Sequence, residues 1–203
     1  MATRFDHGEI QTYSGLAYNF AAPDPASIRL DDIAHALANA CRYAGHTSRF
    51  YSVAEHSVRV SYVLDRWELA QGLASLVPAY GLLHDGHEAY VWDCPRPFKP
   101  LLGDVYSQFA ERADAAIVEA LLPANTSRKV FHLDVIKRAD NVALVAEAKA
   151  LMHHGPESWV DWDDLYSKVP APPEGTFPTE ALGWDPVLAE EAFHARAKEV
   201  GLA

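Results

Sequence analysis

Apolar residues recur at the three- and four-residue spacing of helices over most of this 203-residue chain. The pattern begins at Ile33, Ala34, Leu37 and Ala38 and returns in later segments. Side chains at this spacing share one face of a helix, so each segment can bury an apolar stripe. We therefore predict an all-α fold, with helices near residues 31–40, 52–64, 67–75, 79–90, 105–121, 133–152 and 186–200.

Two stretches depart from the helical pattern. Two β-prone runs, 10–13 and 16–20, flank Ser14-Gly15, which predicts a small hairpin with a two-residue loop. Residues 155–183 are rich in proline, glycine, aspartate and tryptophan, which is typical of an ordered surface loop. The length suits one domain. We expect it to span residues 1–203 as a hairpin and turn extension (1–30), a helical core (31–154), a surface loop (155–183) and a closing helix (184–203).

Charge and composition restrict the partners of the chain. A net charge of −11 argues against general binding to nucleic acid or anionic membranes, because both need a basic face. A small phosphate substrate is still compatible, since a metal and a few cations can reverse the potential inside one pocket. No apolar run is long enough to cross a bilayer, and the N-terminus lacks the apolar core of a signal peptide. We expect a cytoplasmic protein in which Cys41 and Cys94 are reduced and bind no metal.

The dipeptide His84-Asp85 forms the centre of a potential metal site. His56 and Asp140 lie on other predicted helices, and helical bundles commonly build metal sites from facing helices. Two imidazoles and two carboxylates suit Mn, Fe, Co, Ni, Zn or Mg. Glu88 follows His84 by one predicted helical turn and can touch the attacking water. A His-Asp pair often occurs by chance, but this one lies in an apolar segment, where uncompensated polar groups are costly. The combination indicates metal-assisted hydrolysis of a phosphate ester.

The pattern His…His-Asp…Asp, met by His56, His84-Asp85 and Asp140, resembles the signature of the HD-domain metal-dependent phosphohydrolases. The resemblance extends over nearly the full chain to a small-enzyme branch that includes phage deoxyadenosine-triphosphate hydrolases. Bacterial 5′-deoxynucleotidases are more distant relatives with the same site plan. It implies an HD-domain helical bundle and a homo-oligomer. Four further segments carry it: Asp32–Leu37, Cys41–His46, Phe50–Ser57 and Asp93–Lys99.

The resemblance also implies a role for each matching residue. Glu88 would position or deprotonate the attacking water, Asp93 would lie near the nucleotide, and Arg42 would contact substrate phosphate. One divalent metal would bind tightly, and a polyphosphate substrate would bring any second ion. The metal ligands would be His56, His84, Asp85 and Asp140.

Substrate-binding candidates also follow from residue chemistry. Arg42 and Lys99 are cations on predicted loops, where a guanidinium grips phosphate bidentately and an ammonium acts as a point charge. The alternative for both is ordinary surface solvation, and Arg49 is a weaker third candidate. Tyr43 either stacks on a base or is a core or lid aromatic. His46 either contacts phosphate or structures its loop.

These features favour an enzyme that hydrolyses the 5′-phosphate ester of a deoxynucleotide. A triphosphatase would release deoxynucleoside and triphosphate, whereas a monophosphatase would release deoxynucleoside and orthophosphate. Two alternatives stay open. One is a phosphodiesterase for cyclic or oligonucleotides, and the other is a non-catalytic module that senses nucleotides.

Overall fold

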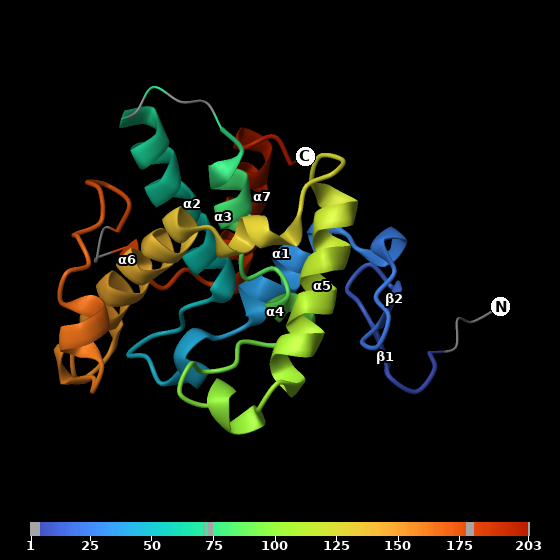
Figure 1. Ribbon diagram of the computed structural model, residues 1–203, viewed down its shortest axis with the longest axis horizontal. Helices are drawn as coiled ribbons and strands as arrows, with labels where there is room; N and C mark the ends of the chain where they lie inside the picture. The colour runs from blue at the N-terminus through green and yellow to red at the C-terminus, as the bar shows by residue number, and fades with distance from the viewer. Residues whose placement is uncertain (1–4, 71, 73–74, 178–180, 203) are drawn as a thin grey trace.

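The computed structural model describes residues 5–70, 72, 75–177 and 181–202. It is mostly helical with a small two-stranded antiparallel sheet, which confirms the expected class (Figure 1). The strands are β1 (Glu9–Gln11) and β2 (Ala17–Asn19). The helices are α1 (Leu30–Asn39), α2 (Val53–Ala70), α3 (Val77–Leu83), α4 (Glu88–Val91), α5 (Val105–Leu121), α6 (Asp134–Leu151) and α7 (Pro186–Glu199).

Shorter helical turns connect these elements. Within the described ranges these are 3-10 turns, apart from one π-helical turn. They are η1 (Pro25–Ser27), η2 (Arg42–Gly45), η3 (Lys99–Leu102), η4 (Arg128–His132), η5 (Pro156–Ser158) and the π-helical η6 (Trp162–Tyr166).

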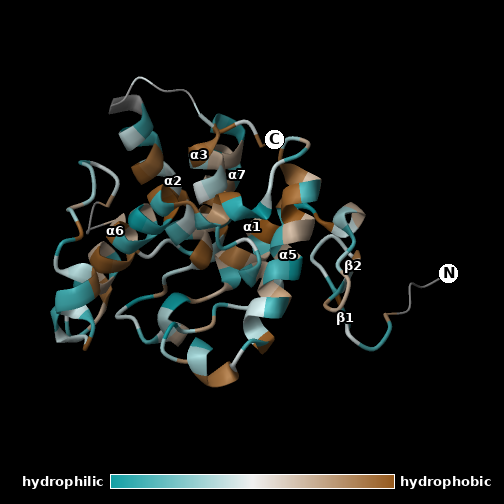
Figure 2. Cartoon of the chain, in the orientation of Figure 1, coloured by the Kyte–Doolittle hydropathy of each residue, from teal (hydrophilic) through white to brown (hydrophobic). Residues whose placement is uncertain are grey.

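Helix α2 is the centre of the fold. It packs against α1, α3, α6 and α7, and its residues 53–61 are all buried. Figure 1 shows the hairpin and α6 on opposite sides of this centre. Figure 2 shows that the outer helices carry both hydrophobic and hydrophilic residues, as expected for helices with one buried face.

Apolar side chains form two main clusters around α2. The larger one joins α1, α3, α5 and α7, with Leu37, Leu83, Ile117 and Phe193 fully buried. The smaller one joins the middle of α2 to α6 through Val60, Leu64, Ile136 and Val142. Burial of this kind holds α2 and α6 side by side, and these are two of the elements that carry the predicted metal ligands.

The hairpin differs in its loop from the prediction. Gln11 pairs with Ala17, so residues 12–16 form a five-residue loop rather than a two-residue turn. Thr12 N donates to Leu16 O at 2.9 Å, which closes the loop. Tyr18 stacks on Tyr90 of α4 with ring centres 4.0 Å apart, and so attaches the sheet to the helical core.

Two helix boundaries also differ. The segments predicted near 52–64 and 67–75 begin as one helix, α2, which ends at Ala70; residues 71, 73 and 74 lie outside the described part. The helix predicted at 79–90 is instead α3 and α4, separated by a turn over 84–87. In that turn Gly86 N donates to Leu83 O at 2.8 Å and Glu88 N donates to Asp85 O at 2.9 Å. This three-residue bonding is tighter than an α-helix, so Glu88 does not sit one α-helical turn above His84.

Ser52 begins α2 as predicted, but Glu55 does not fold back to complete a capping box. Ser52 Oγ accepts from Glu55 N at 3.0 Å. The buried Glu55 carboxylate instead accepts from Arg59 Nη2 at 2.6 Å and from Trp184 N at 2.8 Å. It therefore ties the segment before α7 to the central helix.

The segment 155–183 is more structured than the surface loop predicted from its composition. It contains η5 and η6, and Tyr166, Thr176 and Leu182 are buried, while residues 178–180 lie outside the described part. Arg59 of α2 donates to Thr176 O at 3.0 Å. Among the described helices, none is both long and apolar enough to span a membrane.

We expect Gly81→Ala to lower the free energy of unfolding by about 1–3 kcal/mol, the usual cost of overpacking a core. A Cβ at Gly81 of α3 would lie 2.2 Å from Cδ1 of Leu64, which is fully buried in α2. Denaturant unfolding measures this change. The substitution should cost less in a Leu64→Ala background, and equal costs in both backgrounds would contradict the close contact.

Candidate metal centre

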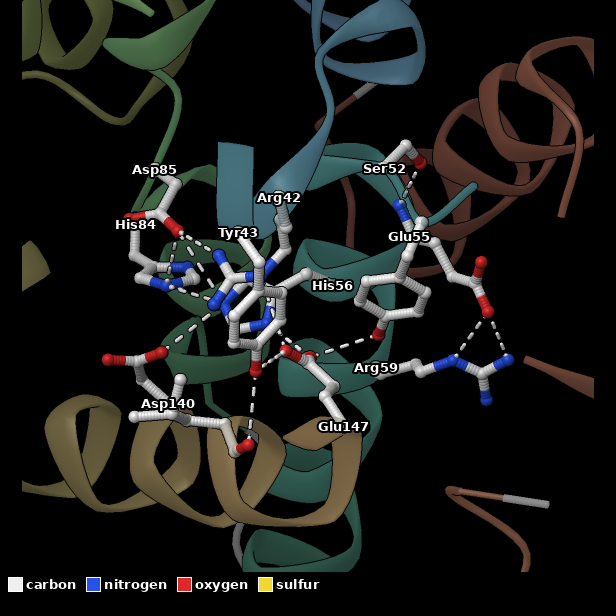
Figure 3. Close-up of polar contacts among 12 residues, drawn as sticks. Arg42, Tyr43, Ser52, Glu55, His56, Arg59, His84, Asp85, Asp140 and Glu147 are labelled. Atoms are coloured by element: carbon white, nitrogen blue, oxygen red, sulfur yellow. Dashed lines mark hydrogen bonds and ion pairs between the residues drawn. The ribbon is translucent and has the colours of Figure 1, made fainter. Parts of the chain in front are cut away.

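Three helical elements bring the four predicted metal ligands together (Figure 3). His56 comes from α2, His84 and Asp85 from the turn after α3, and Asp140 from α6. One ligand atom each of His56, His84 and Asp140 lies within 4.8 Å of the others. Asp85 Oδ2 lies 3.3 Å from His84 Nε2 and 3.5 Å from His56 Nε2. The chain thus gathers two imidazoles and two carboxylates at one point.

Both histidines are oriented so that Nε2 faces the cluster. His56 Nδ1 donates to Glu147 Oε1 at 2.6 Å, and His84 Nδ1 donates to the Gly81 carbonyl at 2.7 Å. The two Nε2 atoms lie 3.4 Å apart. An acceptor on Nδ1 keeps a proton there and leaves the Nε2 lone pair for a metal. The donor set therefore fits a divalent transition metal.

Glu147 is a central residue of the site that sequence reasoning missed. Its carboxylate is fully buried, and Oε1 accepts from His56 and from the Tyr51 hydroxyl at 2.9 Å. Oε2 lies 3.2 Å from both Arg42 Nε and the Tyr43 hydroxyl. Glu147 follows Asp140 by two helical turns on α6, so both can face α2. This seven-residue spacing from Asp140 is the sequence feature that could have identified Glu147 as part of the site.

Mutual attraction sets the protonation of these groups. Burial and Arg42 oppose a charge on His56, but Glu147 and Asp140 outweigh them and raise its pKa to about 9. Burial raises the pKa of the Asp140 and Glu147 carboxyls, but His56 outweighs it and lowers each to about 2. Without a metal, the extra proton of His56 lies on Nε2, the atom that faces the cluster.

Glu88 and Asp93 have raised pKa values, in contrast to Asp140 and Glu147. Glu88 is buried, and its Oε2 has no hydrogen-bond partner within the described ranges. Burial, followed by the charges of Asp85 and Asp93, raises the pKa of Glu88 well above its usual value. Burial also raises the pKa of Asp93. A buried carboxyl without a partner is costly, so Glu88 is the group here that is suited to exchange a proton.

Arg42 lies at the cluster, but it is buried rather than on an open loop. Residues 40–42 pair with 51–53 through hydrogen bonds of 2.9 Å (Arg42 N to Tyr51 O) and 3.0 Å (Val53 N to Ala40 O). Its side chain points to Glu147 and to Asp85, with Nη1 3.4 Å from Asp85 Oδ2. Two carboxylates therefore hold the guanidinium that was predicted to contact phosphate.

The other substrate-binding candidates have different outcomes. The Tyr43 hydroxyl also lies 3.1 Å from Leu144 O, which anchors the ring at the edge of the site. Lys99 Nζ lies 5.0 Å from the ring centre of Tyr106. His46 is exposed and forms no side-chain hydrogen bond or ion pair to any described residue. Arg49 Nη1 donates to Leu182 O at 3.2 Å.

Arg96 is a second residue that the sequence reasoning passed over. Its Nη2 lies 3.6 Å from Asp140 Oδ2, and its Nη1 donates to the Tyr166 hydroxyl. It belongs to the same proline-rich stretch as Asp93 and Lys99. Its position between two prolines gave no direct signal, because contact with Asp140 depends on how this stretch folds against α6.

Two proteins are similar to this chain over much of its length. The uncharacterized protein YfdR of Escherichia coli (strain K12) is 40% identical over 131 residues, which cover 64% of this chain and 68% of YfdR. The uncharacterized protein RCAP_rcc00048 of Rhodobacter capsulatus is 31% identical over 179 residues, which cover 79% of this chain and 86% of the relative. No family model matches the chain.

We expect Glu147→Gln to weaken Mn²⁺ binding by about 10- to 100-fold, because a carboxylate on the second nitrogen orients a metal-binding histidine and makes it more basic. Isothermal titration calorimetry measures the affinity. Glu157→Gln, which removes an exposed carboxylate that pairs with Lys149, is the matched control. Equal affinities in the two variants would contradict the role of Glu147, provided that thermal unfolding shows both to be folded.

Mn²⁺ affinity should rise with pH by at least about tenfold per unit between pH 6 and 8, because a proton must leave His56, and His84, whose pKa is also raised, steepens the rise wherever it is protonated. The imidazole is protonated below its pKa of about 9, and a metal needs the neutral form, so binding strengthens as pH approaches that value. Titrations in buffers of different ionisation enthalpy count the protons released. An affinity that is constant between pH 7 and 8 would contradict the raised pKa.

Proposed function

This chain belongs to the protein family that includes YfdR and RCAP_rcc00048, and we propose that it is an HD-domain metal-dependent phosphohydrolase. Its proposed substrates are deoxynucleotides, which it cleaves at the 5′-phosphate ester. One observation carries the proposal. The Nε2 atoms of two buried histidines and a carboxylate of Asp140 converge near the buried Glu88, whose Oε2 has no hydrogen-bond partner among the residues described.

The metal site would consist of His56, His84, Asp85 and Asp140. A divalent cation held there supplies a Lewis acid that polarises a phosphoryl oxygen and lowers the pKa of water. Glu147 and the Gly81 carbonyl hold the two imidazoles in the orientation that this requires. The ligand atoms are nitrogen and oxygen, which suits Mn, Fe, Co, Ni, Zn or Mg.

The reaction is a displacement at phosphorus by water. The water oxygen forms a bond to phosphorus, the bond from phosphorus to O5′ breaks, and O5′ leaves with a proton. Glu88 accepts the proton of the attacking water, because a carboxyl with a raised pKa is a stronger base once it is ionised. Asp93, whose pKa is also raised, provides the proton for O5′. Arg42, which two carboxylates neutralise, holds Asp85 and Glu147 in place beside the metal site.

The proposal is favoured over its two alternatives by particular residues. A sensor without catalysis needs no acid or base, whereas Glu88 and Asp93 both lie buried or half-buried near Asp85 with raised pKa values. A phosphodiesterase for oligonucleotides would be expected to have a basic surface that attracts its polyanionic substrate, whereas this chain has a net charge of −11.

The direct test incubates the protein with deoxynucleoside mono-, di- and triphosphates and with Mg²⁺, Mn²⁺, Co²⁺ or Zn²⁺. Orthophosphate and triphosphate are detected separately. We expect hydrolysis with at least one metal and its loss on chelation. His84→Ala and Asp85→Ala should abolish both metal binding and hydrolysis. Full activity of either variant would contradict the proposed site.

Glu88→Gln separates catalysis from metal binding. We expect kcat to fall by about 10²- to 10⁴-fold, the usual contribution of a general base, with Mn²⁺ affinity retained. Glu119→Gln, which changes an exposed carboxylate on α5, is the control and should behave as the unchanged protein.

Turnover of a cyclic dinucleotide but of no mononucleotide would favour the phosphodiesterase alternative.

A further inference from the structure

Arg96 places an exposed guanidinium at the edge of the ligand cluster. Its side chain is 57% exposed, and Nη2 lies 3.6 Å from Asp140 Oδ2. The other oxygen of this carboxylate, Oδ1, lies 3.3 Å from His56 Nε2. Arg96 and the cluster therefore share Asp140 through different oxygens. The Arg96 guanidinium is therefore separated from the proposed metal site only by the Asp140 carboxylate.

Arg96 is held in place although it is exposed. Pro95 and Pro97 on either side restrict the backbone. Nη1 donates to the hydroxyl of Tyr166, and the guanidinium carbon lies 5.8 Å from the ring centre of that tyrosine. Tyr166 itself is buried in η6. Tyr166 and Asp140 thus orient the guanidinium, while more than half of the side chain stays exposed.

The cations predicted from sequence do not occupy this position. Arg42 is only 8% exposed, and two carboxylates already neutralise it. Arg49 donates to the carbonyl of Leu182. Lys99 lies three residues after Arg96, and its Nζ lies 5.0 Å from the ring centre of Tyr106.

We propose that Arg96 binds the substrate phosphates beyond the one that is attacked, and that the preferred substrate is a nucleoside triphosphate. This inference rests on the proposed function. Asp85 and Asp140 keep their negative charge at the cluster, because their pKa values are lowered, so a phosphate chain beside them needs a cation at its outer end. A guanidinium grips phosphate bidentately, and its two neighbours already hold it in position. A monophosphate has no phosphate beyond the one that is attacked, so it would lack this contact with Arg96.

The test compares kcat and KM for a deoxynucleoside mono- and triphosphate in the presence of Mn²⁺. For Arg96→Ala we expect KM for the triphosphate to rise by about 10- to 100-fold, the effect of losing charged hydrogen bonds. KM for the monophosphate and kcat for both should change by less than about threefold. Tyr166→Phe should give a smaller rise, because the ring remains but the hydroxyl partner is lost. Arg96→Lys should restore part of the affinity.

The control is Arg128→Ala, which removes an exposed arginine of η4 that pairs with Glu111 of α5 at 2.9 Å. It should leave all constants unchanged. The inference would be overturned by an equal loss for both substrates, by no difference between Arg96→Ala and Arg128→Ala, or by a preference of the unsubstituted protein for the monophosphate. Arg96→Ala must also keep its Mn²⁺ affinity, because a tenfold loss would show that Arg96 instead positions Asp140.

Binding of inorganic triphosphate and orthophosphate, measured by calorimetry with Mn²⁺, separates this inference from the proposed function. Absence of any nucleotide hydrolysis would refute the proposed function alone if triphosphate still binds more tightly than orthophosphate and loses this preference in Arg96→Ala. Hydrolysis without such a preference would leave the proposed function standing and refute the role of Arg96.

Discussion

The hydrogen bond between His56 and the buried carboxylate of Glu147 is the interaction on which the site depends. It joins α2 to α6 across 91 residues of sequence with a distance of 2.6 Å. A carboxylate without partners would be very costly in such a place, yet Glu147 is satisfied by donors from His56, Tyr51, Arg42 and Tyr43. These donors come from three separate parts of the chain. Their convergence fixes the histidine, the 42–45 turn and α6 relative to one another.

Helix α2 uses neighbouring residues for two different purposes. His56 points toward Glu147 and the ligand cluster, whereas Glu55 points toward Arg59 and the segment before α7. Adjacent residues of a helix diverge by about one hundred degrees, so one turn can carry both contacts. In the buried Glu55–Arg59 pair, the carboxylate also accepts from Gly183 N, and the guanidinium donates to Thr176 O and Ala181 O. The C-terminal part of the chain is thereby attached to the helix that carries a proposed metal ligand.

The charges around the cluster divide into two groups with different behaviour. Asp140 and Glu147 have lowered pKa values because they face His56, and they keep their negative charge. Glu88 and Asp93 have raised pKa values because burial dominates. Carboxyls pushed in opposite directions can hold a cation and exchange a proton within one site. The two arginines differ in exposure and in charge compensation. Arg42 is buried and neutralised inside the site, whereas Arg96 is exposed at its edge.

The sequence by itself determined the helical class, the hairpin, the position of α6 and the set of histidines and aspartates that converge. These features follow from local periodicity, and the ligand set was visible as polar residues in an apolar segment together with its family resemblance. Only the tertiary structure decided that the 79–90 segment breaks at residues 84–87, that Glu55 leaves its capping position, and that Glu147 and Arg96 join the site. The break involves local three-residue hydrogen bonds, whereas Glu55, Glu147 and Arg96 contact partners far away in the chain. Carboxylates and guanidinium groups pair with the donors and opposite charges that are nearest in space, and spacing along the sequence does not specify those neighbours.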